Sequence, residues 1–140
     1  MPSVRKIYKQ GNTPIVSLPG HIVRAVAAAL GSSLVIYPIS DKSLVLEVHN
    51  TTPQHLLTLD RVQSMRAVAI RTIYRQGNSF VCSVPRYLLD LLGIGVGDYL
   101  ELQRLSDNAF TATALSREQL LHRQARGLTS YRRDERSNAP

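Results

Sequence analysis

The chain has 140 residues, a formal net charge of +7, 44% hydrophobic and 19% charged residues, and a single cysteine. This length and balance indicate one globular domain or two very small ones, and they exclude an intrinsically disordered chain. One cysteine excludes an internal disulfide framework, and neither a signal-peptide pattern nor an apolar run of about 20 residues is present, so we expect a cytoplasmic protein that does not contact a membrane.

Two stretches of the sequence repeat each other at a constant offset of 66 residues. Residues 5–19 (RKIYKQGNTPIVSLP) match residues 71–85 (RTIYRQGNSFVCSVP), and the offset continues without a gap through residues 48 and 114. A unit that spans only residues 5–48 or 71–114 is close to the lower limit of chain length for burying a useful core. We therefore expect the two copies to complete one core together, or each to pair with a copy from another chain.

The first part of each copy predicts a β-hairpin. Residues 4–10 and 68–76 carry β-branched and aromatic residues without helical spacing, which favours a strand, and a Gly-Asn turn follows each. Pro14 restricts the first return strand to an edge or to a strand start. Period-2 alternation in the two return strands predicts four residues on the core side: Val16, Leu18, Cys82 and Val84. The first strand alternates less cleanly, because Arg5 and Lys9 share a side with Ile7.

A short helix and a second hairpin complete each copy. Pro19 and Pro85 are expected at the first helical position, and Gly31 and Gly93 are expected to end the two helices. The second hairpins are predicted at residues 34–48 and 99–113, with turns at 40–42 and 106–108. Each copy is therefore predicted to run strand, strand, helix, strand, strand.

The predicted organisation has four parts. Residues 1–48 form the first copy, 49–67 a linker that is helical in part from Pro53, 68–114 the second copy, and 115–140 a basic tail with six basic and three acidic residues. In the tail, Ser116-Arg-Glu-Gln119 is a capping-box pattern that predicts a helix to about Gly127. Residues 130–140 are expected to be disordered.

Three segments resemble a known family: GNTPIVSLP at 11–19, GNSFVCSVP at 77–85 and LGIGVGDYLEL at 92–102. They are similar to the swapped-hairpin DNA-binding domains of the AbrB and MazE type, and the second copy matches better than the first. The resemblance implies a mainly β fold with short helices, in which two ββαββ copies exchange hairpins to form a β-barrel. Family members usually carry one unit per chain and dimerise, so the resemblance implies a pseudo-dimer within this chain, and it also allows a homodimer of two such chains.

The resemblance implies that basic residues of the first strand and its turn meet double-stranded DNA. Lys9 and Arg75 stand at the family's basic position before the turn glycine, whereas Ser17 and Ser83 stand where many members have a basic residue. We expect a transcription regulator, a repressor or autoregulator, whose basic face binds a pseudo-palindromic site. The candidate DNA-binding residues are Arg5, Lys6, Lys9, Asn12, Arg71, Arg75, Asn78 and Arg86.

Each candidate has a functional and a structural interpretation. The basic side chains can neutralise phosphates, and arginine can bind guanine, but basic residues also form ordinary solvated surface. Asn12 and Asn78 suit adenine readout and equally suit a tight turn. Tyr8 and Tyr74 can stack on DNA or bond a phosphate, or they can pack in the core.

Other function classes receive less support from the residues. The resemblance also allows an antitoxin that binds a protein toxin through its C-terminal extension, although the positive balance of residues 115–140 argues against that role. An architectural DNA binder would differ only in its specificity. We expect no enzyme, metal or cofactor, because no catalytic set recurs in both copies, the four histidines lack metal-ligand spacing, and the glycines at 93–97 close a helix instead of opening one.

Overall fold

The computed structural model describes residues 2–51, 53–57 and 69–125. The first copy contains β1 (Ser3–Lys6), β2 (Tyr8–Gln10), β3 (Thr13–Leu18), α1 (Gly20–Ala25), β4 (Ser33–Pro38) and β5 (Ser43–His49), and α2 (Pro53–Leu57) follows it in the linker. The second copy contains β6 (Ala69–Thr72), β7 (Tyr74–Gln76), β8 (Ser79–Ser83), α4 (Arg86–Leu91), β9 (Tyr99–Ser106) and β10 (Ala109–Leu115), and α5 (Arg117–Ala125) follows it in the tail. The 66-residue offset therefore relates each element of the first copy to one of the second.

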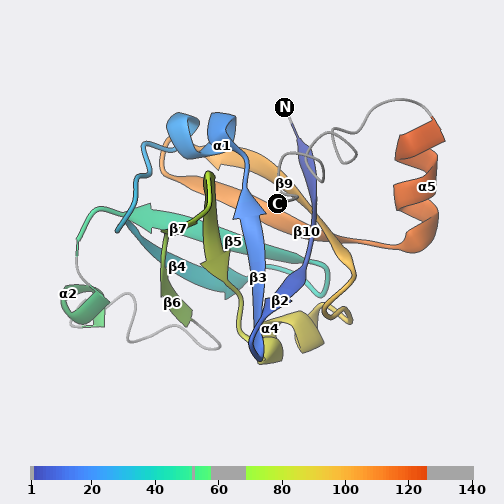
Figure 1. Cartoon of the computed structure of the whole chain (residues 1–140), viewed down its shortest axis with the longest axis horizontal. Helices are drawn as coiled ribbons and strands as arrows, with labels where there is room; N and C mark the ends of the chain where they lie inside the picture. The colour runs from blue at the N-terminus through green and yellow to red at the C-terminus, as the bar shows by residue number, and fades with distance from the viewer. Residues whose placement is uncertain (1, 52, 58–68, 126–140) are drawn as a thin grey trace.

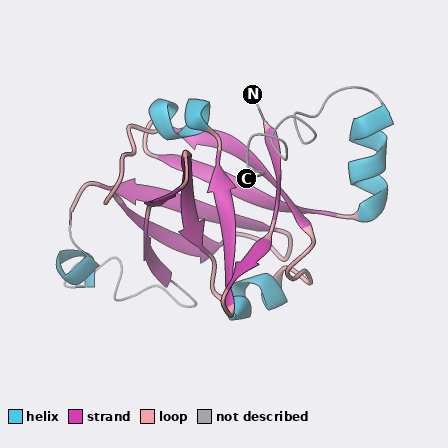
Figure 2. Ribbon diagram, in the orientation of Figure 1, coloured by secondary structure: helices cyan, strands magenta, loops and turns pink. Residues whose placement is uncertain are grey.

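The strands form two antiparallel sheets, and each sheet mixes strands of both copies (Figures 1 and 2). The six-stranded sheet has the order β1-β9-β10-β5-β4-β6, and the four-stranded sheet has the order β2-β3-β8-β7. The first strand of one copy thus pairs with the third strand of the other, as β1 with β9 and β6 with β4. Because β3–β8 and β5–β10 also join the copies, the pairing has a pseudo-twofold symmetry.

Among the described strands, the closed β-barrel implied by the resemblance is not present, since each sheet is open and ends in two edge strands. The single strands predicted at 4–10 and 68–76 are each broken, at Ile7 and Ile73. Ile7 bonds the other copy through its N–H to Asp98 O and its carbonyl to Gly97 N, both at 2.8 Å. The chain changes sheets at this buried residue, which explains why alternation fails in the first strand.

The largest of three hydrophobic clusters in the described residues takes side chains from both sheets and from both copies, and it forms the shared core. The four residues predicted on the core side of the return strands all belong to it: Val16, Leu18, Cys82 and Val84. They pack with side chains of the six-stranded sheet such as Phe110, which is 1% exposed. The prediction that the two copies share one core is confirmed.

The helices lie at the margins of the two sheets, with α1 at the top and α4 at the bottom of the view in Figure 1. Pro19 and Pro85 precede these helices as N-caps and are not the first helical residues, because their carbonyls accept the first helical N–H bonds. The capping box is confirmed, since Gln119 N donates to Ser116 Oγ at 3.1 Å and Ser116 N donates to Gln119 Oε1 at 3.0 Å. The predicted disordered end, 130–140, lies outside the described residues.

Helix α1 ends earlier than predicted, at Ala25, and Gly31 is not its stop. Instead Ala27 takes a left-handed backbone with φ 55°, and Ala28 N bonds Val23 O at 2.9 Å. The equivalent turn after α4 has Gly93 at φ 73° and the matching bond from Ile94 N to Leu89 O. Both helices thus close with the same Schellman-type turn, and the first copy uses alanine where the second uses glycine.

Replacing Ala27 by glycine is expected to stabilise the protein by about 1 kcal/mol, because a left-handed residue with a Cβ is strained. Gly93→Ala should destabilise by a similar amount, since a Cβ there meets no atom within 4 Å and only the backbone strain remains. Chemical denaturation measures both changes. Ala25→Gly is the control, because it lies within the helix and should be destabilising. Equal effects of glycine at positions 25 and 27 would contradict the strain argument.

Candidate nucleic-acid interface

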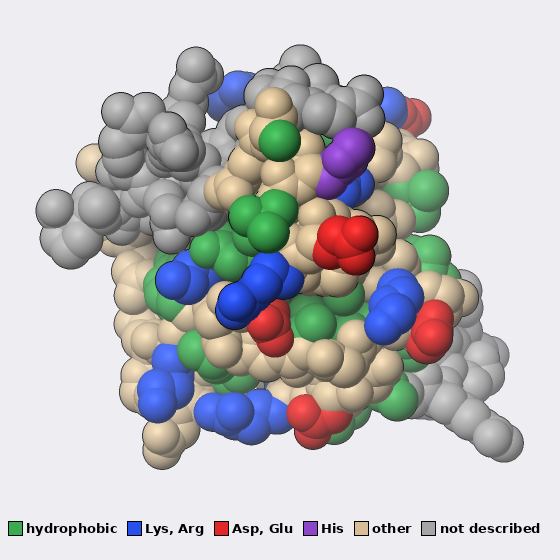
Figure 3. Space-filling model, turned by 90° about the vertical axis from the view of Figure 1, so that its right-hand side faces the viewer, with side chains coloured by type: hydrophobic (Ala, Val, Ile, Leu, Met, Phe, Trp, Pro, Cys, Tyr) green, Lys and Arg blue, Asp and Glu red, His purple; other side chains and the backbone are tan. Residues whose placement is uncertain are grey.

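The four-stranded sheet and its two hairpin turns carry basic residues and no carboxylate. Residues 8–18 and 74–83 include Lys9 and Arg75 but no Asp or Glu. On the side of the molecule that carries α5, by contrast, Lys and Arg side chains are interspersed with Asp and Glu (Figure 3). There Arg123 forms a bidentate ion pair with Glu101, at 2.7 and 3.1 Å. The four-stranded sheet is therefore the surface where a polyanion would meet no like charge.

The two Gly-Asn turns lie at opposite ends of this sheet, because β3 and β8 run antiparallel. Leu18 lies opposite Phe80, with Asn12 six residues before Leu18 along the first chain segment and Asn78 two residues before Phe80 along the second. These eight steps, at about 3.3 Å each, separate the two turns by about 26 Å. This distance equals the rise of about eight base pairs of B-DNA.

The outward face of the sheet is crossed by two equivalent hydrogen bonds between its edge strands. Tyr8 donates its hydroxyl to Gln76 Oε1 at 3.1 Å, and Tyr74 donates to Gln10 Oε1 at 3.0 Å. Burial raises the pKa of Tyr8, the neighbouring Tyr74 raises it further, and the charge of Arg5 partly opposes both. Burial also raises the pKa of Tyr74. Both tyrosines are half-buried, and each lies in register with a fully buried residue of the neighbouring strand, Tyr8 with Ile15 and Tyr74 with Val81.

The single basic face expected from the sequence is divided. Lys9 and Arg75 lie on opposite edge strands, in register with Pro14 and Phe80, so they leave the sheet on the side opposite to the tyrosines. Six of the eight candidates are exposed: Lys6, Lys9, Asn12, Arg75, Asn78 and Arg86. Arg71 is half-buried, whereas Arg5 is only 8% exposed. The equivalence of Arg5 and Arg71 in the repeat thus does not extend to their exposure.

Three of the candidates, Asn12, Arg71 and Arg86, come together around one pocket. Arg86 Nη2 donates to the backbone carbonyl of Asn12 at 3.0 Å, which joins the first-copy turn to α4 of the second copy. Arg71 Nη1 donates to the Ile70 carbonyl at 2.9 Å. The pocket is lined by Asn12, Thr13, Pro14, Arg71, Ser83, Val84, Pro85 and Arg86. The sequence identified the three residues as candidates but did not predict that they would line the same pocket.

Sequence reasoning missed Arg24 of α1 as a basic residue at the other end of the sheet. A Cβ built on Gly20 would lie 3.2 Å from Arg24 Nη1, so this guanidinium covers the position equivalent to Arg86. Comparison of the copies concealed it, because Asp90 stands at the position equivalent to Arg24. The only feature that could have pointed to Arg24 is its exposed position on the helix, in a stretch without nearby acidic residues.

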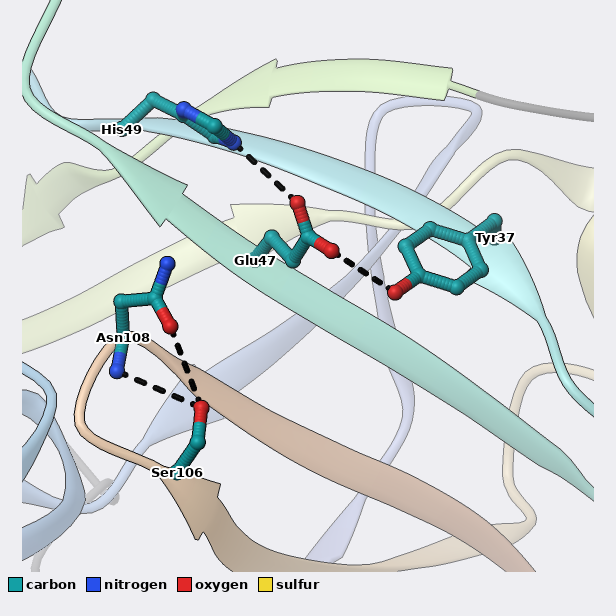
Figure 4. A network of polar contacts seen from close by, with 5 residues as sticks. All are labelled: Tyr37, Glu47, His49, Ser106 and Asn108. Carbon is teal, nitrogen blue, oxygen red and sulfur yellow. Dashed lines mark hydrogen bonds and ion pairs between the residues drawn. The ribbon is translucent and has the colours of Figure 1, made fainter. Parts of the chain in front are cut away.

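Away from the four-stranded sheet's surface, Cys82 lies in the core, and several polar groups of the six-stranded sheet contact one another. Cys82 is fully buried, and burial raises its pKa to about 12 although the charge of Arg71 acts to lower it. Tyr37 donates to Glu47 at 2.8 Å, and Glu47 also lies 3.2 Å from His49, while Ser106 donates to Asn108 (Figure 4). Within the described ranges no cluster of His, Cys, Asp or Glu could hold a metal ion.

Comparison with known proteins identifies no relative: no protein-family model, curated protein or solved structure matches the chain. In the part of the chain that the structure describes, no helix has the length and apolar character needed to cross a membrane. The AbrB- and MazE-type resemblance therefore stays a prediction that rests on the sequence motifs.

Proposed function

We propose that the protein is a DNA-binding transcription regulator of the swapped-hairpin type, which binds a pseudo-palindromic duplex in the cytoplasm and acts as a repressor or autoregulator. The observation that carries the proposal is the pseudo-twofold four-stranded sheet, which is free of carboxylates and has a Gly-Asn turn beside a basic residue at each end. A two-fold protein surface suits a palindromic site, because each half of the duplex presents the same groups in opposite directions.

The strand pairing supports the swapped-hairpin part of the proposal. In such a domain, strands of one unit complete the sheet of the other, and here β1 pairs with β9 while β6 pairs with β4. The crossing residue Ile7 bonds Gly97 and Asp98 of the second copy, and Ile73 bonds Gly31 and Ser32 of the first. These contacts are reciprocal, as an exchange between two equivalent units requires.

The charge distribution supports the DNA part of the proposal. Exposed Lys9 and Arg75 flank the two turns, and a total charge of +7 favours a polyanionic partner. The separation of about 26 Å between the turns predicts half-site centres about eight base pairs apart. Since Arg86 has Gly20 as its counterpart, the two half-sites need not be equivalent.

The test is fluorescence-anisotropy binding to the DNA just upstream of the protein's own gene and to a scrambled duplex, over a series of salt concentrations. We expect the upstream DNA to bind more tightly. Lys9→Ala/Arg75→Ala should lower affinity by about 10- to 100-fold and reduce the log–log salt slope by about 2, because two phosphate contacts are lost.

A charge-matched control is Lys42→Ala/Arg104→Ala, which removes two cations from the hairpins of the six-stranded sheet. This control should keep nearly wild-type affinity. Equal losses in both double variants would mean that only total charge matters, which contradicts the proposed surface. If neither duplex binds at physiological salt, the DNA function is wrong, and a protein partner such as a toxin becomes the next candidate.

A further inference from the structure

We infer that the pocket between the first-copy turn and the start of α4 is an anion site that binds one phosphoryl group through Arg71 and Arg86. The phosphoryl group belongs either to the DNA backbone or to a free phosphorylated ligand. The DNA alternative rests on the proposed function, whereas binding of a free phosphoryl group does not.

The lining of the pocket suits an oxyanion. It combines the two guanidinium groups with the hydroxyls of Thr13 and Ser83 and the amide of Asn12, and it contains no carboxylate. The remaining walls are apolar, from Pro14, Val84 and Pro85. Arginine forks match the geometry of phosphate oxygens, and hydrogen bonds between two charged groups are stronger than neutral ones.

Both arginines keep donors available for a ligand. Arg71 and Arg86 each donate one bond to a backbone carbonyl, which fixes the side chain and leaves most of the five guanidinium N–H groups for other acceptors. Neither forms an ion pair with a carboxylate among the described residues. The pocket therefore contains two oriented positive charges whose neutralising partner is not supplied by the described part of the chain.

The size of the pocket limits the ligand. Its volume of about 210 Å³ is below the roughly 300 Å³ at which sites for drug-sized molecules begin. At about 30 Å³ per water, it holds a phosphoryl group with a few waters. A bulky organic group would have to remain outside, so the site recognises the phosphoryl group itself.

Within the described residues this lining occurs at one end of the sheet, because the equivalent residues of the other copy differ. Gly20 replaces Arg86, Phe80 replaces Pro14, and Leu18 replaces Val84. Arg5, the counterpart of Arg71, is only 8% exposed. The backbone thus has pseudo-twofold symmetry, but the side chains that line the anion site do not follow it.

The experiment is a titration of the full chain with inorganic phosphate, followed by amide chemical shifts in two-dimensional NMR. We expect saturable shifts at Thr13, Ser83 and Arg86, and an affinity at least about tenfold lower in Arg86→Gln and in Arg71→Gln. Arg24→Gln is the matched control at the equivalent end and should bind phosphate as the wild type does. Unsaturable shifts spread over all basic residues, or equal affinity in all three variants, would overturn the inference.

A second titration, in the presence of saturating upstream duplex, identifies the source of the phosphoryl group. If the pocket holds a backbone phosphate, DNA shifts the same amides and inorganic phosphate no longer binds. If the ligand is free, phosphate still binds to the DNA complex. If DNA binds but inorganic phosphate causes no response at the pocket, this inference is rejected and the proposed function stands. If phosphate binds at the pocket but DNA does not bind, the proposed function is rejected and this inference stands.

Discussion

Replacing Phe110 by alanine is expected to lower the free energy of unfolding by about 3–5 kcal/mol, through lost apolar burial and the cavity left behind. Phe110 is 1% exposed and lies on β10, which pairs with both β9 and β5 near the middle of the six-stranded sheet. Its neighbours in the core come from both copies, so the surrounding residues cannot close the cavity by moving one hairpin. Denaturant unfolding followed by circular dichroism measures the change.

Two further variants make this result interpretable. Thr111→Ala changes the next residue of β10, which lies half-buried on the opposite face, and should cost no more than about 1 kcal/mol. Phe110→Leu should give an intermediate loss and remains measurable if the alanine variant unfolds, because a domain has only about 5–15 kcal/mol of stability. Similar losses for Phe110→Ala and Thr111→Ala would show that the core is not centred on Phe110.

Local patterns predicted the elements of this fold well. The repeated Gly-Asn turns, the prolines before α1 and α4, and the capping box from Ser116 act through contacts a few residues apart, so the sequence alone is sufficient to locate them. The constant offset predicted that every element of the first copy would recur in the second. The alternation of apolar and polar residues in the return strands also predicted correctly which of their side chains face the core.

Features set by contacts between the copies could not be predicted in this way. The break at Ile7 depends on bonds to Gly97 and Asp98, which are distant in sequence. The burial of Arg5 and the exposure of Lys9 depend on which sheet each part of the first strand joins. The sequence was sufficient to choose the candidate DNA-binding residues. It could not predict that they would be divided between two sheet edges and one pocket, because that division depends on contacts between the copies.

Cutting the chain between residues 57 and 69 is expected to leave the fold intact while each isolated half loses it. Of the eight pairings between described strands, four join the two copies, including both central pairs, β3–β8 and β5–β10. These contacts persist when only the covalent connection is removed. A protease site inserted between residues 57 and 69, followed by gel filtration and circular dichroism, provides the measurement.

Each isolated half presents strands whose partners belong to the other half, and it contains only part of the shared core. A unit of this size is too small to bury enough surface alone, so each half should be unfolded as a monomer or paired with a second copy of itself. Mixing the two halves should restore the native spectrum, because β1 then regains β9 and β6 regains β4. Cooperative unfolding of one half as a monomer would contradict this dependence, since it would show that the copies are independent domains whose shared sheets contribute little to stability.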